Sequence, residues 1–233
     1  MFDLSNLPPW DLMLKKMLWQ QLGPLEGQKI LDFGSGEGWT AAKYAQHNDV
    51  TAVEPSGTML EKRVGGDSYL QLQGSCELLS EMPDETFDVI FCHNVLEYIE
   101  DKEAVLKALA RLLKPGGRLS LVKHNRLGRI MQMTVLLNDF EHAHALLSGE
   151  NGRSGQFGAI RYYDDADVLR WLPEMRCTKL WGLRTFWDMQ QNQQCHADAE
   201  WQEKMLAIET RVSTMPTFQA ISFFHHMLLY KMN

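Results

Sequence analysis

Cysteine is scarce in this chain, and long apolar runs are absent. The four cysteines show no C-x-x-C spacing, which argues against a disulfide framework or a cysteine zinc site; they are Cys76, Cys92, Cys177 and Cys195. The eight histidines also lack metal-ligand spacing, so no metal is expected. Because no apolar run reaches about 18 residues and the start is not signal-like, we expect a cytoplasmic protein without a membrane segment.

Positive charge is also in short supply. The formal net charge of −7 argues against a surface that is generally coated with nucleic acid. One stretch departs from this average, because residues 107–138 contain seven Lys or Arg and no acid. Lys123, Arg126 and Arg129 fall at and beyond the end of a predicted strand, where a substrate would lie. The length of 233 residues suits a single domain with additions.

Residues 30–40 are the stretch around which the chain is organised. An apolar run, an acid and three glycines at alternate positions predict a buried strand, a tight turn and a helix start. Asp32, at the strand end, would repel a pyrophosphate and attract an ammonium or sulfonium group. The third glycine also comes one position earlier than in the dinucleotide motif G-x-G-x-x-G. These features favour a cationic cofactor over a nicotinamide dinucleotide, the alternative being an ordinary strand-to-helix turn with a surface Asp.

This turn resembles the first motif of the class I S-adenosylmethionine (SAM) dependent methyltransferases of type 11, acid-x-G-x-G-x-G. The matching residues are Asp32, Gly34, Gly36 and Gly38. Glu54 follows at the end of the next predicted strand, where the family has an acid that binds the ribose hydroxyls. The resemblance implies SAM as the cofactor and a Rossmann-like fold.

The family also places cofactor contacts after its third and fourth strands. Ser75 stands where the family commonly has an Asp for the adenine, so this contact is left open among Ser75, Glu77 and the main chain. The polar pair after the fourth strand usually meets the methionine part of the cofactor. The resemblance therefore implies these cofactor-binding residues: Asp32, Phe33, Gly34, Ser35, Gly36, Gly38, Glu54, Pro55, Ser75, Cys76, Glu77, His93 and Asn94.

Strand and helix patterns alternate along most of the chain. Strands are predicted at 30–33, 50–53, 69–73, 87–92, 118–123, 178–186 and 221–231. Helices are predicted at 10–22, 40–47, 56–64, 101–113, 126–147, 164–172 and 197–212, with Ser56 and Asp101 as N-caps. This order predicts an α/β fold with a doubly wound, seven-stranded, mostly parallel sheet whose last strand is antiparallel.

The expected organisation is one methyltransferase domain spanning 1–233. Residues 1–24 would supply a helix that covers the cofactor, and 125–161 a helical cap inserted after the fifth strand, which we expect to bind substrate. Within the cap, the glycine-rich residues 148–158 predict a flexible loop.

Methyl transfer needs a general base only if the nucleophile must lose a proton. His93, His124 and Tyr162 are candidates by position, although a structural role is the commoner one for each. The catalytic residue is therefore left open.

Outside the cofactor half, the sequence contains Asn125, the run Arg184-x-Phe186-x-Asp188 and the triplet Glu209-Thr210-Arg211. These motifs resemble those of the bacterial methyltransferases that esterify carboxymethoxyuridine at the tRNA wobble position. The resemblance implies that Asn125, Arg184 and Arg211 bind the acceptor. A carboxylate acceptor is ionised at pH 7 and needs cations rather than a base. That family's lysine-rich insert has no counterpart in 148–158. We therefore expect a methyltransferase for a polar or anionic small molecule, with tRNA, or a non-enzymatic SAM-binding module, as alternatives.

Overall fold

The computed structural model describes residue 4 and residues 6–155 and 158–232. The chain forms two compact units. The helical unit comprises Met1–Gly23, Lys123–Tyr162 and Leu180–His226, and the sheet unit comprises Pro24–Val122, Tyr163–Lys179 and Met227–Asn233. Each unit therefore joins segments that lie far apart in the sequence.

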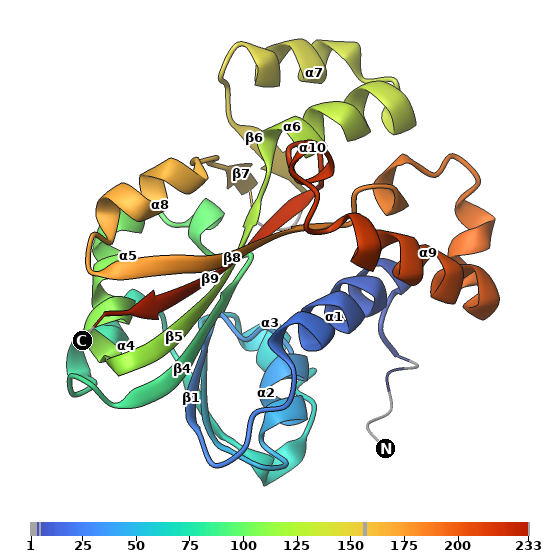
Figure 1. Ribbon diagram of the computed structural model, residues 1–233. Coiled ribbons are helices and arrows are strands. Elements are labelled where there is room, and N and C mark those ends of the chain that lie inside the picture. Colours follow the sequence, from blue (N-terminus) through green and yellow to red (C-terminus); the bar gives the residue numbers. More distant parts are fainter. Residues whose placement is uncertain (1–3, 5, 156–157, 233) are drawn as a thin grey trace. The chain divides into compact units, whose positions relative to one another are not determined.

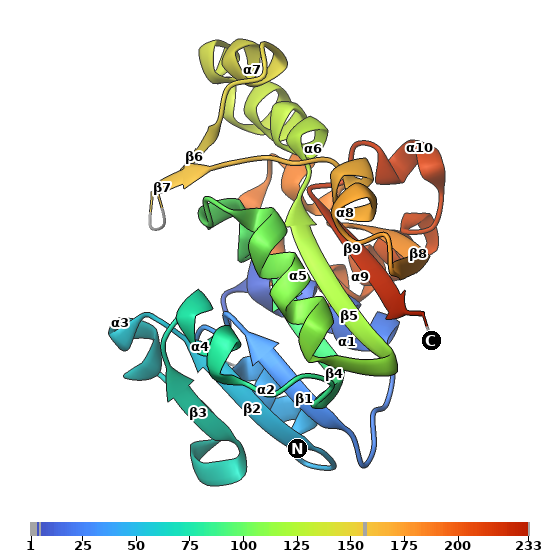
Figure 2. The same ribbon diagram turned by 90° about the vertical axis from the view of Figure 1, so that its left-hand side faces the viewer.

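The sheet unit is built on a seven-stranded sheet with the order β3-β2-β1-β4-β5-β9-β8 (Figures 1 and 2). The strands are β1 (Lys29–Phe33), β2 (Asp49–Glu54), β3 (Leu70–Gln73), β4 (Phe87–His93), β5 (Leu113–His124), β8 (Met175–Leu183) and β9 (Phe224–Lys231). β1 pairs in parallel with β2 and β4, β2 with β3, and β4 with β5. In Figure 2 the arrowheads of β5 and β9 point in opposite directions, so β9 is antiparallel. The predicted doubly wound, mostly parallel sheet is confirmed.

Apolar sequence explains why β1 and β4 lie at the centre of the sheet. Ile30 and Leu31 in β1, and Ile90 and Phe91 in β4, are all fully buried. A parallel strand covered on both faces needs such a continuous apolar run. The edge strand β3 has no fully buried residue, in keeping with its position.

Short helices connect the strands of the sheet unit. They are α2 (Trp39–Tyr44), α3 (Gly57–Leu60), η1 (Gly66–Ser68), α4 (Cys76–Glu81), η2 (Leu96–Tyr98), α5 (Lys102–Leu112) and α8 (Asp165–Trp171). The two predicted N-caps are confirmed, because Ser56 accepts from the Met59 N–H and Asp101 from the Ala104 N–H. α3 ends before the predicted position 64, since the Val64 N–H donates to the Glu37 carbonyl instead of continuing the helix.

The helical unit holds most of the remaining elements. They are α1 (Pro9–Leu22), α6 (Arg126–Met131), the π-helical turn η3 (Gln132–Leu137), α7 (Phe140–Leu147), β6 (Gly152–Ser154), β7 (Gly158–Ile160), η4 (Trp187–Met189), η5 (Gln193–Ala197), α9 (Ala199–Val212) and α10 (Pro216–Gln219). α1 packs against α9, and α6 packs against α7.

Two expectations about the cap residues are wrong in detail. The helix expected at 126–147 is interrupted, because Asn138 adopts a left-handed conformation with φ +52° and Asp139 then caps α7 by accepting from the His142 N–H. The expected loop at 148–158 contains β6, which pairs antiparallel with β7; residues 156 and 157 lie outside the described residues. Local hydrophobic periodicity cannot report a single left-handed residue.

Three strand boundaries also differ from the expected ones. β5 begins at Leu113 rather than 118, because Leu113 already pairs with Phe87 across a register shift. β8 covers Met175–Leu183 rather than 178–186, and it ends where Arg184 turns to a left-handed φ of +56°. β9 begins at Phe224 rather than 221.

Candidate functional site

The carboxyl ends of the central parallel strands meet at one edge of the sheet unit. In the register, Phe33 of β1 lies beside Val53 of β2 and Cys92 of β4. The glycine turn, Glu54 and His93 therefore gather at the same edge. This is the edge at which open parallel sheets bind their ligands.

The three glycines of the turn all have positive φ, but they are needed for different reasons. A Cβ at Gly34 would stand 2.3 Å from Val95, and one at Gly38 would stand 1.9 Å from the Tyr69 hydroxyl oxygen. A Cβ at Gly36 would meet no atom within 4 Å. Gly34 and Gly38 are therefore required by packing, whereas Gly36 leaves open space above its main chain.

Most main-chain donors of this turn are already used inside the sheet unit. The Gly34 and Ser35 N–H groups donate to the Val53 carbonyl at 2.8 and 3.0 Å, and the Gly38 N–H to the Ser35 carbonyl at 3.0 Å. The Gly36 N–H donates to Glu54 Oε2 at 2.9 Å. A pyrophosphate site presents free N–H groups to its ligand. This turn therefore offers little to a dinucleotide.

The acids of the edge are buried. Asp32 is 3% exposed and Glu54 is 8% exposed. Glu54 also accepts from the Ser56 N–H at 2.9 Å through Oε1, so both of its oxygens brace the main chain. Each carboxylate oxygen has a second lone pair, so Glu54 can still accept a hydrogen bond from a ligand hydroxyl.

Several polar atoms at this edge are buried and have no hydrogen-bond partner among the described residues. Ser35 Oγ and Asn94 Oδ1 are two of them. Asn94 is also left-handed, with φ +57°, and its N–H donates to the Val122 carbonyl at 2.9 Å. A buried polar atom left unpaired costs about 1–3 kcal/mol, so a polar ligand would stabilise this edge. Together with the open space at Gly36, these atoms fit a polar, cationic cofactor.

The other predicted cofactor residues show less evidence of a free contact for a ligand. His93 contacts Ser120 Oγ through Nε2 at 2.8 Å and stacks on Phe91, which favours a structural role for its ring. Glu77 Oε1 accepts from the Ser75 N–H at 2.7 Å, which lowers the pKa of this exposed carboxyl. Phe33 is the last residue of β1, Pro55 directly follows the last residue of β2, and Cys76 is the first residue of α4.

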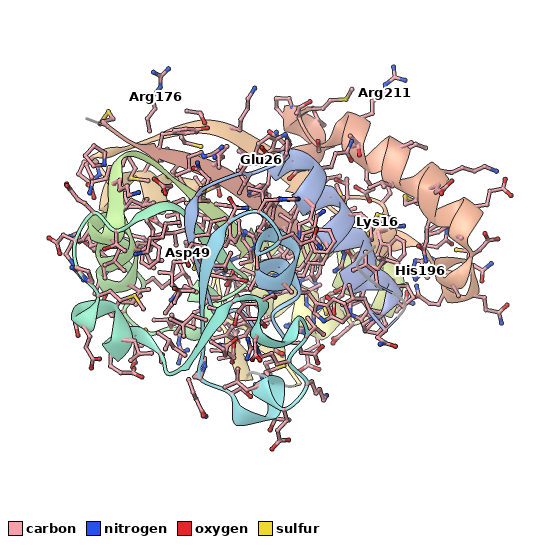
Figure 3. All side chains as sticks on the ribbon, turned by 90° about the horizontal axis from the view of Figure 1, so that it is seen from below. Lys16, Glu26, Asp49, Arg176, His196 and Arg211 are labelled. Atoms are coloured by element: carbon pink, nitrogen blue, oxygen red, sulfur yellow. The ribbon has the colours of Figure 1, made fainter. Side chains whose placement is uncertain are left out.

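The helical unit places the predicted acceptor residues in unequal positions. Asn125 uses both amide donors on the Ala220 and Ser222 carbonyls at 2.9 and 2.8 Å, and its Oδ1 accepts from the Leu127 N–H. Its side chain is therefore occupied. Arg211 is exposed near the end of α9, and Figure 3 shows its side chain extending away from the ribbon.

Arg184 is the buried cation among the predicted acceptor residues. Its Nε donates to Asp188 Oδ2 at 2.9 Å, and Nη2 pairs with Oδ1. The guanidinium lies 5.1 Å from the Phe223 ring centroid and 5.2 Å from that of Phe224. Nη1 has no hydrogen-bond partner in the described part of the chain. Asp188 therefore fixes Arg184 while leaving one edge of its guanidinium available.

His124 and Tyr162, the general-base candidates in the helical unit, are poorly suited to accept a proton. Burial lowers the pKa of His124 to about 3, helped by the positive charges of Arg129, Arg184 and Lys123. His124 is therefore neutral at pH 7 and holds a proton poorly. Tyr162 lies under the Arg126 guanidinium, 5.1 Å from its ring centroid. Neither residue is set up as a strong general base.

Sequence reasoning missed the network around Arg184. Gln132, in the π-helical turn, accepts from Arg129 and donates to Asp188 Oδ1 at 3.3 Å. Arg129 also has a buried Nε without a hydrogen-bond partner among the described residues. The charge of Arg129 was visible in the sequence, but its link to Asp188, 59 positions later, left no local signal.

In the described part of the chain, no group of three or more His, Cys, Asp or Glu could hold a metal ion. No helix among the described residues is both long and apolar enough to cross a membrane. A surface hollow lies at the other ends of the strands, lined by residues that include Lys29, Asp49, Asp88 and Lys114. The Lys114–Asp88 ion pair of 2.7 Å occupies part of it, so it is no candidate for the catalytic site.

Comparison with known proteins shows what this chain resembles. Residues 31–121 match the family described as methyltransferase domain. The chain is 28% identical to the Escherichia coli tRNA 5-carboxymethoxyuridine methyltransferase, over 92% of this chain and 87% of that protein. It is 37% identical to a Xylella fastidiosa ubiquinone biosynthesis O-methyltransferase, over 44% of each chain. The crystal structure of a SAM-dependent methyltransferase from Mesorhizobium loti superposes with a TM-score of 0.59 at 15% identity, covering 98% of this chain and all of that one.

Proposed function

We propose that the chain, which belongs to the SAM-dependent methyltransferases, transfers the methyl group to an ionised carboxylate on its acceptor. The observation that carries this proposal is the pair of guanidinium groups of Arg184 and Arg129, which are linked through Asp188 and Gln132. Asp188 pairs with Arg184 and is the one acid in this network of four residues, which therefore holds one more positive than negative charge. A partly buried excess of this kind suits an anion.

The chemistry of a carboxylate acceptor agrees with the absence of a strong base. A carboxylate is already ionised at pH 7, so its oxygen can attack the methyl carbon without losing a proton. The new O–C bond forms as the methyl–sulfur bond breaks, and the electron pair of that bond stays on sulfur. Arg184 Nη1 and Arg129 would orient the acceptor oxygens, which is the main requirement of an in-line transfer.

We assign cofactor binding to the strand edge of the sheet unit. SAM supplies an electrophilic methyl group on a sulfonium, and Asp32 and Glu54 give this edge the matching negative charge. Ser35 Oγ and Asn94 Oδ1 would gain hydrogen-bond partners from the bound cofactor. The remaining assigned residues are Phe33, Gly34, Gly36, Gly38, Pro55, Ser75, Cys76, Glu77 and His93.

The acceptor is proposed in two forms that share one chemistry. A small carboxylic acid remains the simpler form. Likeness to the E. coli tRNA 5-carboxymethoxyuridine methyltransferase supports the second form, because it extends over 92% of this chain, whereas likeness to the ubiquinone biosynthesis enzyme covers 44%. Only the longer likeness reaches both the cofactor edge and the segments that hold Arg129 and Arg184. In either form, residues 125–161 act as a cap that supplies Arg129.

A methyl-transfer assay with two acceptors tests the proposal. Purified protein is incubated with methyl-labelled SAM and either phenoxyacetate or tRNA that carries unmethylated 5-carboxymethoxyuridine. We expect label in one of them, released as methanol by mild base, because esters hydrolyse where ethers and methylamines do not. Label only in phenoxyacetate supports the small-molecule form, and label only in tRNA supports the other. Base-stable label, or label in neither, contradicts carboxylate methylation.

A further inference from the structure

We infer that Glu209 is a positioning residue for acceptor recognition: its buried carboxylate holds the turn 185–187 that presents Arg184. The inference rests on the proposed function, in which Arg184 receives the acceptor carboxylate. Glu209 lies on α9, 25 positions after Arg184. It would not touch the acceptor itself, so its effect must pass through the turn.

The contacts of Glu209 are all directed at this turn. Its side chain is fully buried. Oε2 accepts from the Thr185 N–H at 2.7 Å, and Oε1 accepts from the Phe186 and Trp187 N–H groups at 2.8 and 2.9 Å. Three consecutive main-chain donors, beginning directly after Arg184, thus converge on one carboxylate. Charge-assisted hydrogen bonds of this kind are stronger than those between neutral groups.

Arg184 needs such support because its backbone is in a costly conformation. Its φ of +56° is in the left-handed region, which non-glycine residues occupy only when the surrounding structure holds them there. The left-handed residue ends β8 at Leu183 and turns the chain toward Asp188. Glu209 fixes the main chain that follows Arg184, and Asp188 fixes its guanidinium. The direction of Nη1 therefore depends on both acids.

The choice of a carboxylate is informative in itself. No Lys, Arg or His pairs with Glu209 in the described part of the chain, and burial raises its pKa while the three N–H groups oppose that shift. A buried carboxylate without a cation is expensive unless it is fully hydrogen-bonded. A glutamine could accept from two of these groups, but its NH₂ would face the third as a second donor. Glutamate is thus the better-matched side chain for this turn.

The test compares Glu209→Gln with Glu203→Gln, an exposed position on the same helix that undergoes the same change. Three quantities are measured: hydrogen exchange of the 185–187 amides, affinity for S-adenosylhomocysteine, and KM for whichever of phenoxyacetate and carboxymethoxyuridine tRNA the wild type methylates. We expect Glu209→Gln to speed exchange and to raise the acceptor KM about tenfold, as when one charged hydrogen bond is lost, with unchanged cofactor affinity. Glu203→Gln should change none of them. Glu209→Asp, which keeps the charge on a shorter side chain, should recover part of the loss.

Each other result has a defined meaning. Unchanged hydrogen exchange of the 185–187 amides in Glu209→Gln would overturn the inference that Glu209 holds this turn. Faster exchange with an unchanged acceptor KM overturns the positioning role, and equal losses of cofactor and acceptor affinity show a general structural defect, which also overturns it. If the wild type methylates neither acceptor, the proposed function fails and the link to acceptor binding fails with it. The exchange measurement then still decides whether Glu209 holds the turn.

Discussion

The two units of the molecule differ in the charged residues that they bury, because only the helical unit buries cations among the residues that the structure describes. In the sheet unit, the buried charged residues are Asp32, Glu54 and Glu97, which are all acids. The helical unit buries Lys123 and Arg184 together with Asp188 and Glu209. An acidic edge suits a sulfonium cofactor, and a site with Arg184 and the half-buried Arg129 suits an anionic acceptor. The proposed reaction would then join a cation and an anion to form two neutral products.

This contrast has a consequence for turnover. Each unit would attract its charged reactant electrostatically. The products would not be attracted in this way, because a methyl ester and a thioether carry no charge at the reacting centre. Interactions that weaken once the reaction is complete favour product release. A site with less water also favours a step in which opposite charges disappear. The acids of the sheet unit and the arginines of the helical unit would thus serve both reactant binding and product release.

Removing Arg184 should have the largest effect on this contrast. Arg184→Ala leaves Asp188 as a buried charge without its partner, which costs about 3–5 kcal/mol of folding free energy in comparable pairs. We expect a loss of this size in urea unfolding, confined to the helical unit, with S-adenosylhomocysteine affinity retained. The double variant Arg184→Ala/Asp188→Asn should recover part of the stability but none of the acceptor binding. Recovery of both would show that Arg184 has only a structural role.

Acid sensitivity should also belong to the helical unit. Burial lowers the pKa of His124 and that of His226 to about 3, and both residues lie in this unit. An unfolded histidine binds its proton near pH 6.5, so stability is fully present above that pH and is lost as the pH falls toward 3. Each residue should contribute a slope of about 1.4 kcal/mol per pH unit within this window.

The variant His124→Gln isolates one of these contributions. We expect the difference in unfolding free energy between wild type and variant to change by about 1.4 kcal/mol per unit between pH 6 and pH 4. His47→Gln, at an exposed position in the sheet unit, serves as the control and should leave the slope unchanged. A difference that does not depend on pH would contradict the neutral, buried state of His124.

The glycine turn provides a matched pair for the sheet unit. Gly36 and Gly66 have φ values of +58° and +55°, and a Cβ at either would meet no atom within 4 Å. An alanine at either position should cost about 1–2 kcal/mol, because both would be held in the left-handed region. Only Gly36→Ala should also weaken S-adenosylhomocysteine binding, by about tenfold or more, measured by calorimetry. Equal affinities in the two variants would place the cofactor elsewhere.

The same contrast explains what could be predicted from the sequence. The sheet unit could be predicted because its signals are local. The glycines, Asp32 and Glu54 fall within one strand–helix–strand unit, β1-α2-β2, and the central strands are continuous apolar runs. The helical unit depends on distant pairs, such as Asn125 with residues 220–222 and Glu209 with the turn at 185–187. Arg184 was identified from a motif resemblance, but neither its left-handed backbone nor the roles of Asp188, Gln132 and Glu209 has a local sequence signature.

Arg211 should show the smallest effect and can separate the two forms of acceptor. Its side chain is exposed, so Arg211→Ala should change the unfolding free energy by no more than about 0.5 kcal/mol. With phenoxyacetate the variant should keep its KM, because a small acceptor would be held by the buried guanidinium of Arg184. With tRNA, an exposed arginine can contact a phosphate, and its loss should weaken binding and reduce the dependence of binding on salt by about one phosphate contact. A reduced salt dependence would thus support tRNA as the acceptor of the helical unit. An unchanged salt dependence would show that Arg211 does not take part in acceptor binding.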